Sequence, residues 1–193
     1  SLGTVVMAAS SAAFNIEIMT FYILNSFSQA CTTFVGQNFG AGDLRRCRRT
    51  LLLCLGEGIA VLAVAVSTIL FFGKPLLSIF NRDPQVIETG YLRLMMVMLS
   101  HGLSLVYDVV SGYLRGFGIS LVPALLTMLG VCGIRIAWVQ FVFPQSATFR
   151  TLMTVYPVSL TTTALLMTAA LLIYRPTKRF AALQRKDTDP SAK

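Results

Sequence analysis

The stretch FVGQNFGAGDLRRCRR, Phe34 to Arg49, separates two long apolar segments and decides how the rest of the chain is arranged. Its second half places four arginines within five positions: Arg45, Arg46, Arg48 and Arg49. Arginines beside an apolar span mark the cytoplasmic side of a membrane, because moving them through lipid is costly. The glycines in the stretch permit a tight connection, and Asp43 stands at the N-cap position of the following helix. We therefore expect a short cytoplasmic connection between two membrane helices.

Composition places the chain among membrane proteins. It has 193 residues, of which 55% are apolar and 12% charged, against about 25% charged in soluble domains. The formal net charge is +8, but the basic residues stand at the ends of apolar runs, which predicts membrane lipids rather than nucleic acid as partners. The four cysteines form no C-x-x-C pair, and the sequence shows no phosphate loop, catalytic triad or metal-ligand spacing. We infer neither an enzyme nor a metal or organic cofactor.

The apolar runs predict an all-α, polytopic membrane helix bundle with five transmembrane helices visible. A span needs about 20 apolar residues, and the runs that reach this length are roughly 14–35, 50–72, 88–113, 121–143 and 151–174. Residues 1–13 are too short to span and are expected to form an outer connection. We expect residues 1–180 to form one transmembrane lobe and the polar residues 181–193 to be a disordered cytoplasmic tail.

The distribution of basic residues predicts the orientation. The side that holds the arginine stretch carries eleven of them: Arg45, Arg46, Arg48, Arg49, Arg115, Arg175, Lys178, Arg179, Arg185, Lys186 and Lys193. The opposite side carries three: Lys74, Arg82 and Arg150. This asymmetry predicts an outer N-terminus and a cytoplasmic C-terminus. Because the chain starts outside and without a signal peptide, we expect it to be a fragment of a longer protein.

Two acids inside the predicted spans are candidates for ion coupling, since an ionisable group in lipid is costly and marks function by default. Asp108 lies seven residues before Arg115, and Glu57 lies seven residues beyond Thr50, so each is about 10 Å deep from the cytoplasmic side. We expect the two carboxylates to share a level and, if their faces meet, a proton or a cation. The alternative is that each acid lies in a wet vestibule or bonds a backbone group.

A polar stripe accompanies Asp108. Ser104 and Ser111 stand four residues before and three residues after it, and His101 falls on the same helical face. His101 is a candidate proton relay, with a helix–helix hydrogen bond as the alternative. Arg135 lies near the middle of the fourth predicted span, and Glu17 lies near the outer end of the first, so we expect these two in-membrane charges to form a structural pair.

Two segments carry a resemblance to a known family. The segment SQACTTFVGQNFGAGDLRRCRR, which includes Gly36, Gln37 and Gly40, is similar to a helix ending in V-G-Q-x-x-G-A followed by basic residues. The segment SGYLRGFGISLVPALLTMLGVCGIRIAWV, which includes Arg115 and Gly116, is similar to an L-R-G-x-G turn running into the next helix. Both motifs, in this order and about 65 residues apart, resemble the multidrug and toxic compound extrusion (MATE) family of antiporters.

The resemblance implies a transporter of twelve helices in two lobes. This chain would be the C-terminal lobe without its first helix, and its partner would be the missing N-terminal lobe. The implied function is export of small organic cations, such as drugs, by antiport with H⁺ or Na⁺ across a plasma membrane, here a bacterial inner membrane. The resemblance also implies an acid and a tyrosine for ion coupling on the third span, where Tyr107 and Asp108 are adjacent and the acid is displaced by about one turn from the family's position. A slight excess of acids in the spans also leads us to expect an acidic cavity. Alternatives are a related flippase for lipid-linked or polysaccharide substrates and a non-transporting membrane scaffold.

Overall fold

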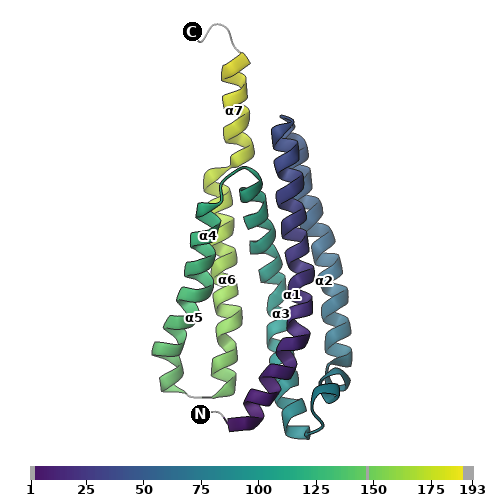
Figure 1. Ribbon diagram of the computed structural model, residues 1–193. Helices are drawn as coiled ribbons and strands as arrows, with labels where there is room; N and C mark the ends of the chain where they lie inside the picture. The colour runs from purple at the N-terminus through teal and green to yellow at the C-terminus, as the bar shows by residue number, and fades with distance from the viewer. Residues whose placement is uncertain (1–2, 147, 189–193) are drawn as a thin grey trace.

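The computed structural model describes residues 3–146 and 148–188, and for residues 183–188 it describes the backbone alone. The chain forms a bundle of long helices that run alternately up and down (Figure 1). The helices before the fourth are α1 (Gly3–Gly40), α2 (Leu44–Phe80) and α3 (Pro84–Gly116). The helices after it are α6 (Phe149–Tyr174) and α7 (Pro176–Thr188). The fourth long helix, Leu121–Gln145, is continuous but irregular.

Five of these helices are long and apolar enough to cross a membrane, which confirms the predicted all-α membrane bundle. Two boundaries differ from the prediction. Residues 3–13 belong to α1 and are not an outer connection, because they continue its helical backbone without a break. After α6, α7 extends through Thr188, so residues 181–188 are helical and not a disordered tail. Residues 189–193, also assigned to that tail, lie outside the described residues.

The helix boundaries follow from local chemistry that the sequence shows. Asp43 caps α2 by accepting a hydrogen bond from the backbone N–H of Arg46 at 2.9 Å, and Gly42 takes a positive φ of 76° in the connection before it. Asp83 caps α3 in the same way, with Pro84 as the first helical residue. The cap at Asp43 confirms the prediction from the sequence.

The fourth helix alternates between α-helical and π-helical turns. Its segments are α4 (Leu121–Thr127), the π-helical η1 (Met128–Gly133), α5 (Ile134–Ala137), the π-helical η2 (Trp138–Val142) and the short 3₁₀ turn η3 (Phe143–Gln145). Gly130 in η1 allows α6 to come close, since a Cβ atom at this position would meet the Thr163 side chain. π-helical turns are rare and occur often at functional sites.

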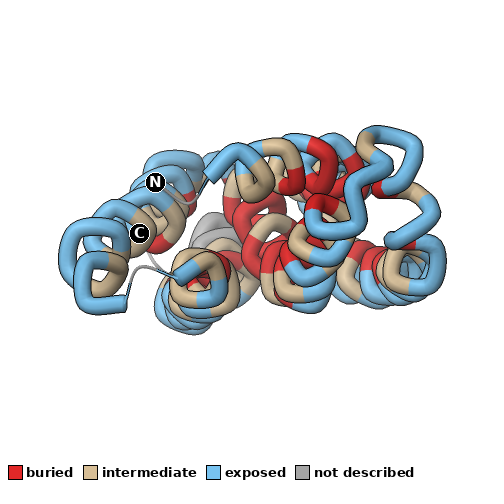
Figure 2. The backbone as a smooth tube through the Cα atoms, turned by 90° about the horizontal axis from the view of Figure 1, so that it is seen from below, coloured by how far each residue is buried: buried red, intermediate tan, exposed pale blue. Residues whose placement is uncertain are grey.

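Helix α3 is the centre of the bundle and packs against α1, α2 and α6. The buried residues lie on the faces that these helices turn towards one another (Figure 2). Helices α1 and α3 approach closely at Gly112, where a Cβ atom would meet the carbonyl oxygen of Ser28 and its Oγ. This absence of a side chain allows the backbones to meet, as small residues do at membrane helix crossings.

The basic residues gather at one end of the bundle. That end is formed by the C-terminal ends of α1, α3 and α6 and the N-terminal end of α2 (Figure 1). Among the described side chains it carries eight arginines and lysines: Arg45, Arg46, Arg48, Arg49, Arg115, Arg175, Lys178 and Arg179. The opposite end carries Lys74, Arg82 and Arg150. The helical arrangement therefore places the two groups at opposite ends, as the topology predicted from the sequence requires.

Candidate functional site

A polar pocket of about 440 Å³ lies between α1, α3 and the fourth helix, and it contains Asp108. Helix α1 contributes Asn25, Ser28 and Gln29, and the fourth helix contributes Thr127 and apolar neighbours. Ser111 and Arg115 join Asp108 from α3, one and two turns further along the helix. The pocket therefore presents hydroxyl and amide groups around a single carboxylate, next to one guanidinium.

Asp108 keeps acceptor capacity that the protein does not use. Its Oδ2 atom is buried and has no hydrogen-bond partner within the described part of the chain. The Nε atom of Arg115 is also buried without a hydrogen-bond partner among the described residues. A buried carboxylate oxygen without a donor is costly, so such an atom points to a ligand that completes it. A proton or a small cation can do this, because oxygen ligands suit hard cations.

A chain of hydrogen bonds connects the pocket to the helix crossing. Ser28 Oγ donates to the backbone carbonyl of Asp108 at 2.7 Å, and Arg115 Nη2 donates to Ser28 Oγ at 2.9 Å. Thr32 Oγ1 lies 3.1 Å from the carbonyl oxygen of Gly112 and also bonds within α1. These bonds fix α1 against α3 at the depth of Asp108. Ser28 is not among the candidate site residues predicted from the sequence, although polar side chains cluster around it in the first span.

Asp108 and Glu57 do not line a common pocket within the described residues. Glu57 is exposed on α2 and does not line the pocket that holds Asp108. The next residue, Gly58, is the one that faces α3, where a Cβ atom would lie 2.8 Å from Leu105 Cδ1. Depth alone suggested the pair, but the rotation of α2 turns Glu57 away from α3.

A second polar pocket, of about 320 Å³, lies between α1, α3, the fourth helix and α6. Five of its polar residues are Glu17, His101, Ser104, Tyr107 and Arg135, and Tyr156 joins them from α6. Asp108 does not line it, so the structure divides the predicted polar stripe between two pockets. Val131 lines both of them, and the two pockets are therefore neighbours.

The predicted pair of Arg135 and Glu17 is wrong, because Glu17 is bound by Arg93. Arg93 Nε lies 2.8 Å from Glu17 Oε1 and Arg93 Nη2 lies 2.9 Å from Glu17 Oε2, with both side chains buried. This two-pronged geometry is the strongest that an arginine and a carboxylate form. Glu17 and Arg93 both lie near the same end of the parallel helices α1 and α3, and this shared depth was a signal in the sequence, although it does not fix which arginine reaches Glu17.

Arg135 instead faces aromatic and hydroxyl groups of α6. Its guanidinium carbon lies 4.5 Å from the centre of the Tyr156 ring, and its Nε lies 3.3 Å from Ser159 Oγ. No carboxylate pairs with Arg135 within the described residues. Because Arg93 neutralises Glu17, the second pocket keeps one positive charge. The expected acidic cavity is therefore not observed here.

His101 is buried and bonded to its own helix. Its Nδ1 lies 2.8 Å from the carbonyl oxygen of Val97, one turn earlier in α3. It shares the second pocket with Glu17 and is separated from the pocket of Asp108. This arrangement places no direct relay between His101 and Asp108.

The two sequence motifs pack against each other at the basic end of the bundle. A Cβ atom at Gly116 would lie 2.6 Å from Val35 Cγ1, and a Cβ atom at Gly36 would lie 3.7 Å from the Gly116 carbonyl oxygen. Gln37 and Gly40 are exposed, and nothing lies close to Gly40. Arg115 lines the Asp108 pocket, where it bonds Ser28.

Comparison with known proteins agrees with these motifs. The sequence matches the MatE family profile over residues 1–139. The chain belongs to the MatE family. This MatE chain is 27% identical over 173 residues to a probable multidrug resistance protein NorM of Chromobacterium violaceum, a match that covers 86% of the chain and 37% of that relative.

Other relatives are similar over shorter stretches. The human multidrug and toxin extrusion protein 1 is 30% identical over 130 residues, which is 67% of the MatE chain and 23% of that protein. A FAD transporter of Shewanella oneidensis is 33% identical over 82 residues, or 42% of the chain and 18% of that relative. The MatE chain thus spans less than half the length of these relatives, and its apolar helices make it a multi-pass membrane protein.

Proposed function

We propose that this chain is the C-terminal lobe of a multidrug efflux antiporter that exports small organic cations in exchange for H⁺ or Na⁺. The names of the NorM and extrusion relatives support drugs and toxins as the cargo. The observation that carries the coupling is the buried Asp108 carboxylate oxygen, which has no partner in its pocket within the described residues. The substrate path would lie between this lobe and a second lobe, as in transporters built from repeated halves.

In this proposal Asp108 holds the coupling ion and the surrounding groups position it. Ser111 and the side chains from α1 offer oxygen and amide groups around the carboxylate. Arg115 bonds Ser28 and provides a positive charge nearby, which makes a bound cation easier to release. Binding and release at one site, exposed to alternate sides, would couple ion entry to cargo export.

The proposal is tested by transport in the full-length protein that contains this chain. Cells that lack their own efflux pumps and express this protein should accumulate less of a fluorescent organic cation than control cells. A collapse of the proton or sodium gradient should abolish this difference. The 193-residue chain expressed by itself should insert and show no export, because half of the cavity wall is missing. Export by the chain alone would contradict the lobe assignment.

We also propose that the basic end of the bundle faces the cytoplasm in a bacterial inner membrane. Single cysteines placed at Arg46 and at Arg150, in a protein without its native cysteines, report this orientation. A membrane-impermeant maleimide added to whole cells should label position 150 and leave position 46 unlabelled. Labelling of position 46 in intact cells would reverse the proposed orientation.

One observation favours a second cargo class, an aromatic anion. Arg135 keeps its positive charge in the second pocket and lies over the ring of Tyr156. A relative is named a FAD transporter, and FAD combines flat rings with phosphates. Inside-out vesicles are incubated in parallel with FAD and with an organic cation. Only the true cargo should be taken up, which distinguishes the two classes.

A further inference from the structure

A third pocket, of about 750 Å³, lies at the basic end of the bundle, where α2 begins and where α6 passes into α7. Four cationic side chains line it: Arg45 and Arg48 from α2, Arg175 from the junction, and Lys178 from α7. No aspartate or glutamate lines it within the described residues. The pocket is separate from the two that hold Asp108 and Glu17.

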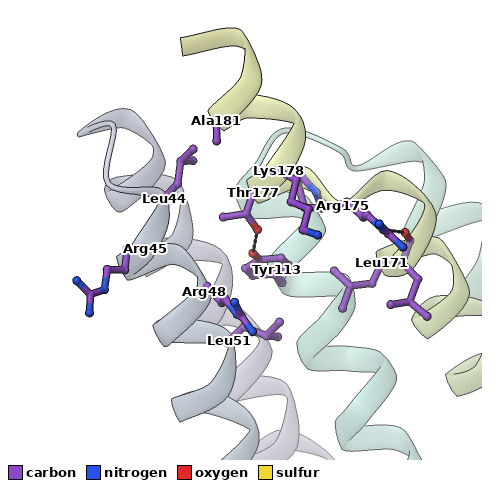
Figure 3. Close-up of a pocket in the computed structure, with 12 residues that line it drawn as sticks. Leu44, Arg45, Arg48, Leu51, Tyr113, Leu171, Arg175, Thr177, Lys178 and Ala181 are labelled. Atoms are coloured by element: carbon purple, nitrogen blue, oxygen red, sulfur yellow. Dashed lines mark hydrogen bonds between the residues drawn. The ribbon is translucent and has the colours of Figure 1, made fainter. Parts of the chain in front are cut away.

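Two of the cations lie beside a hydrogen bond between two hydroxyl groups (Figure 3). Tyr113 and Thr177 form a hydrogen bond of 2.9 Å between their hydroxyl oxygens, which joins α3 to α7. In this view Arg48 lies below this bond and Lys178 to its right, whereas Arg45 points away from it. Arg175 has left-handed backbone geometry with φ 39° and donates from Nε to the carbonyl oxygen of Leu172 at 2.8 Å.

Apolar side chains continue from this charged centre along the helices. Leu51 of α2 and Leu171 and Leu172 of α6 line the same pocket, on the side of the membrane spans. The lining therefore changes from cationic to apolar along the helix axes. Free phosphate or another soluble anion would use the cationic part alone, whereas a phospholipid matches both parts.

None of the four cations is neutralised by a salt bridge within the described part of the chain. The salt bridges found there join Arg46 to Asp43, Lys74 to Glu88 and Arg93 to Glu17. Uncompensated arginine and lysine around a cavity attract phosphate, since they supply several donors and positive charge. Basic pockets between helices at the cytoplasmic surface are typical places for anionic headgroups.

We propose that this pocket binds one anionic phospholipid, with the phosphate between Arg48 and Lys178 and the acyl chains along Leu51, Leu171 and Leu172. The bound lipid would connect α2 to α7. Placement in the cytoplasmic leaflet rests on the proposed orientation, but the binding itself depends on neither the orientation nor the transport function.

Native mass spectrometry of the full-length protein tests the proposal. The protein is purified in detergent, stripped of lipid and titrated separately with dioleoyl phosphatidylglycerol, dioleoyl phosphatidylcholine and glycerol 3-phosphate. Phosphatidylglycerol should bind one to one and roughly tenfold or more tightly than phosphatidylcholine. Glycerol 3-phosphate should bind far more weakly, because it lacks the acyl chains.

Paired variants locate the site. Arg48→Gln with Lys178→Gln should weaken phosphatidylglycerol binding by roughly tenfold or more. The matched control, Arg49→Gln with Arg179→Gln, removes the same charge from neighbouring positions that do not line the pocket and should leave binding unchanged. The exchange Arg48→Lys with Lys178→Arg keeps both positive charges and should keep phosphatidylglycerol binding. It therefore distinguishes a loss of the cations from a disturbance of folding by substitution at these positions.

Three results would each overturn the proposal. Equal affinity for the two lipids would show that headgroup charge is not recognised. Equal affinity for phosphatidylglycerol and glycerol 3-phosphate would show an anion site without a lipid. Equal weakening by the two glutamine pairs would show attraction to the whole basic surface and not to this pocket.

Discussion

Replacing Asp108 by asparagine in the full-length protein is expected to reduce export of an organic cation to the level of cells without the transporter. The substitution keeps the size of the side chain and removes its titratable charge, so Oδ2 can no longer hold a coupling ion in the pocket. Binding of the cargo to the purified protein should survive in part. Accumulation of the fluorescent cation in cells measures the first effect, and equilibrium binding in detergent measures the second.

Glu57→Gln is the matched control for this prediction. It removes a carboxylate at a similar predicted depth, but Glu57 is exposed on α2 and outside the pocket. Export should therefore remain close to that of the unchanged protein. Normal, gradient-dependent export by the Asp108→Asn protein would exclude Asp108 from coupling. A loss of export with Glu57→Gln as large as that with Asp108→Asn would show that the two acids act together after all.

Replacing Arg93 by methionine is expected to lower the free energy of unfolding by about 3–5 kcal/mol. The change leaves the buried Glu17 carboxylate without the two hydrogen bonds that Arg93 donates. An uncompensated charge in this environment is costly. The fraction of monodisperse protein in size-exclusion chromatography and the thermal unfolding midpoint should both fall.

Two further variants separate the ion pair from the loss of any cation. Arg135→Met removes an arginine that has no carboxylate partner in the described residues. It should therefore lower the free energy of unfolding by less than Arg93→Met does. The double variant Arg93→Met with Glu17→Met should be more stable than Arg93→Met alone, since no buried charge is left unpaired. A larger loss with Arg135→Met than with Arg93→Met would contradict this account of the buried charges.

The sequence was sufficient for the parts of the fold that depend on local patterns. Apolar run lengths predicted the five spans, and Asp43 predicted the start of α2. These features depend on residues close together in the chain. The continuation of α1 back to Gly3 and the helical α7 were missed, because polarity and shortness do not by themselves exclude a helix.

The candidate site was predictable only in part. Asp108 stood out because an acid within an apolar run is costly. Depth along a helix gave no information on rotation, and so the sequence left open whether Glu57 faces α3; in the structure its neighbour Gly58 does. The partner of Glu17 depended on which of two arginines reached it across the bundle. Such contacts come from the packing of helices far apart in sequence, and one sequence does not specify them.

The irregular fourth helix has a consequence for motion. It supplies one wall of the Asp108 pocket and one wall of the Glu17 pocket, and Val131 belongs to both. The opposite walls, α1 and α3, are fastened together by Ser28, Thr32 and Arg115. A displacement of the fourth helix would therefore change the access of water and ions to both charged sites in one movement, while the fastened pair stays intact. Its π-helical turns are where such a helix bends most easily, since their hydrogen bonding is already irregular.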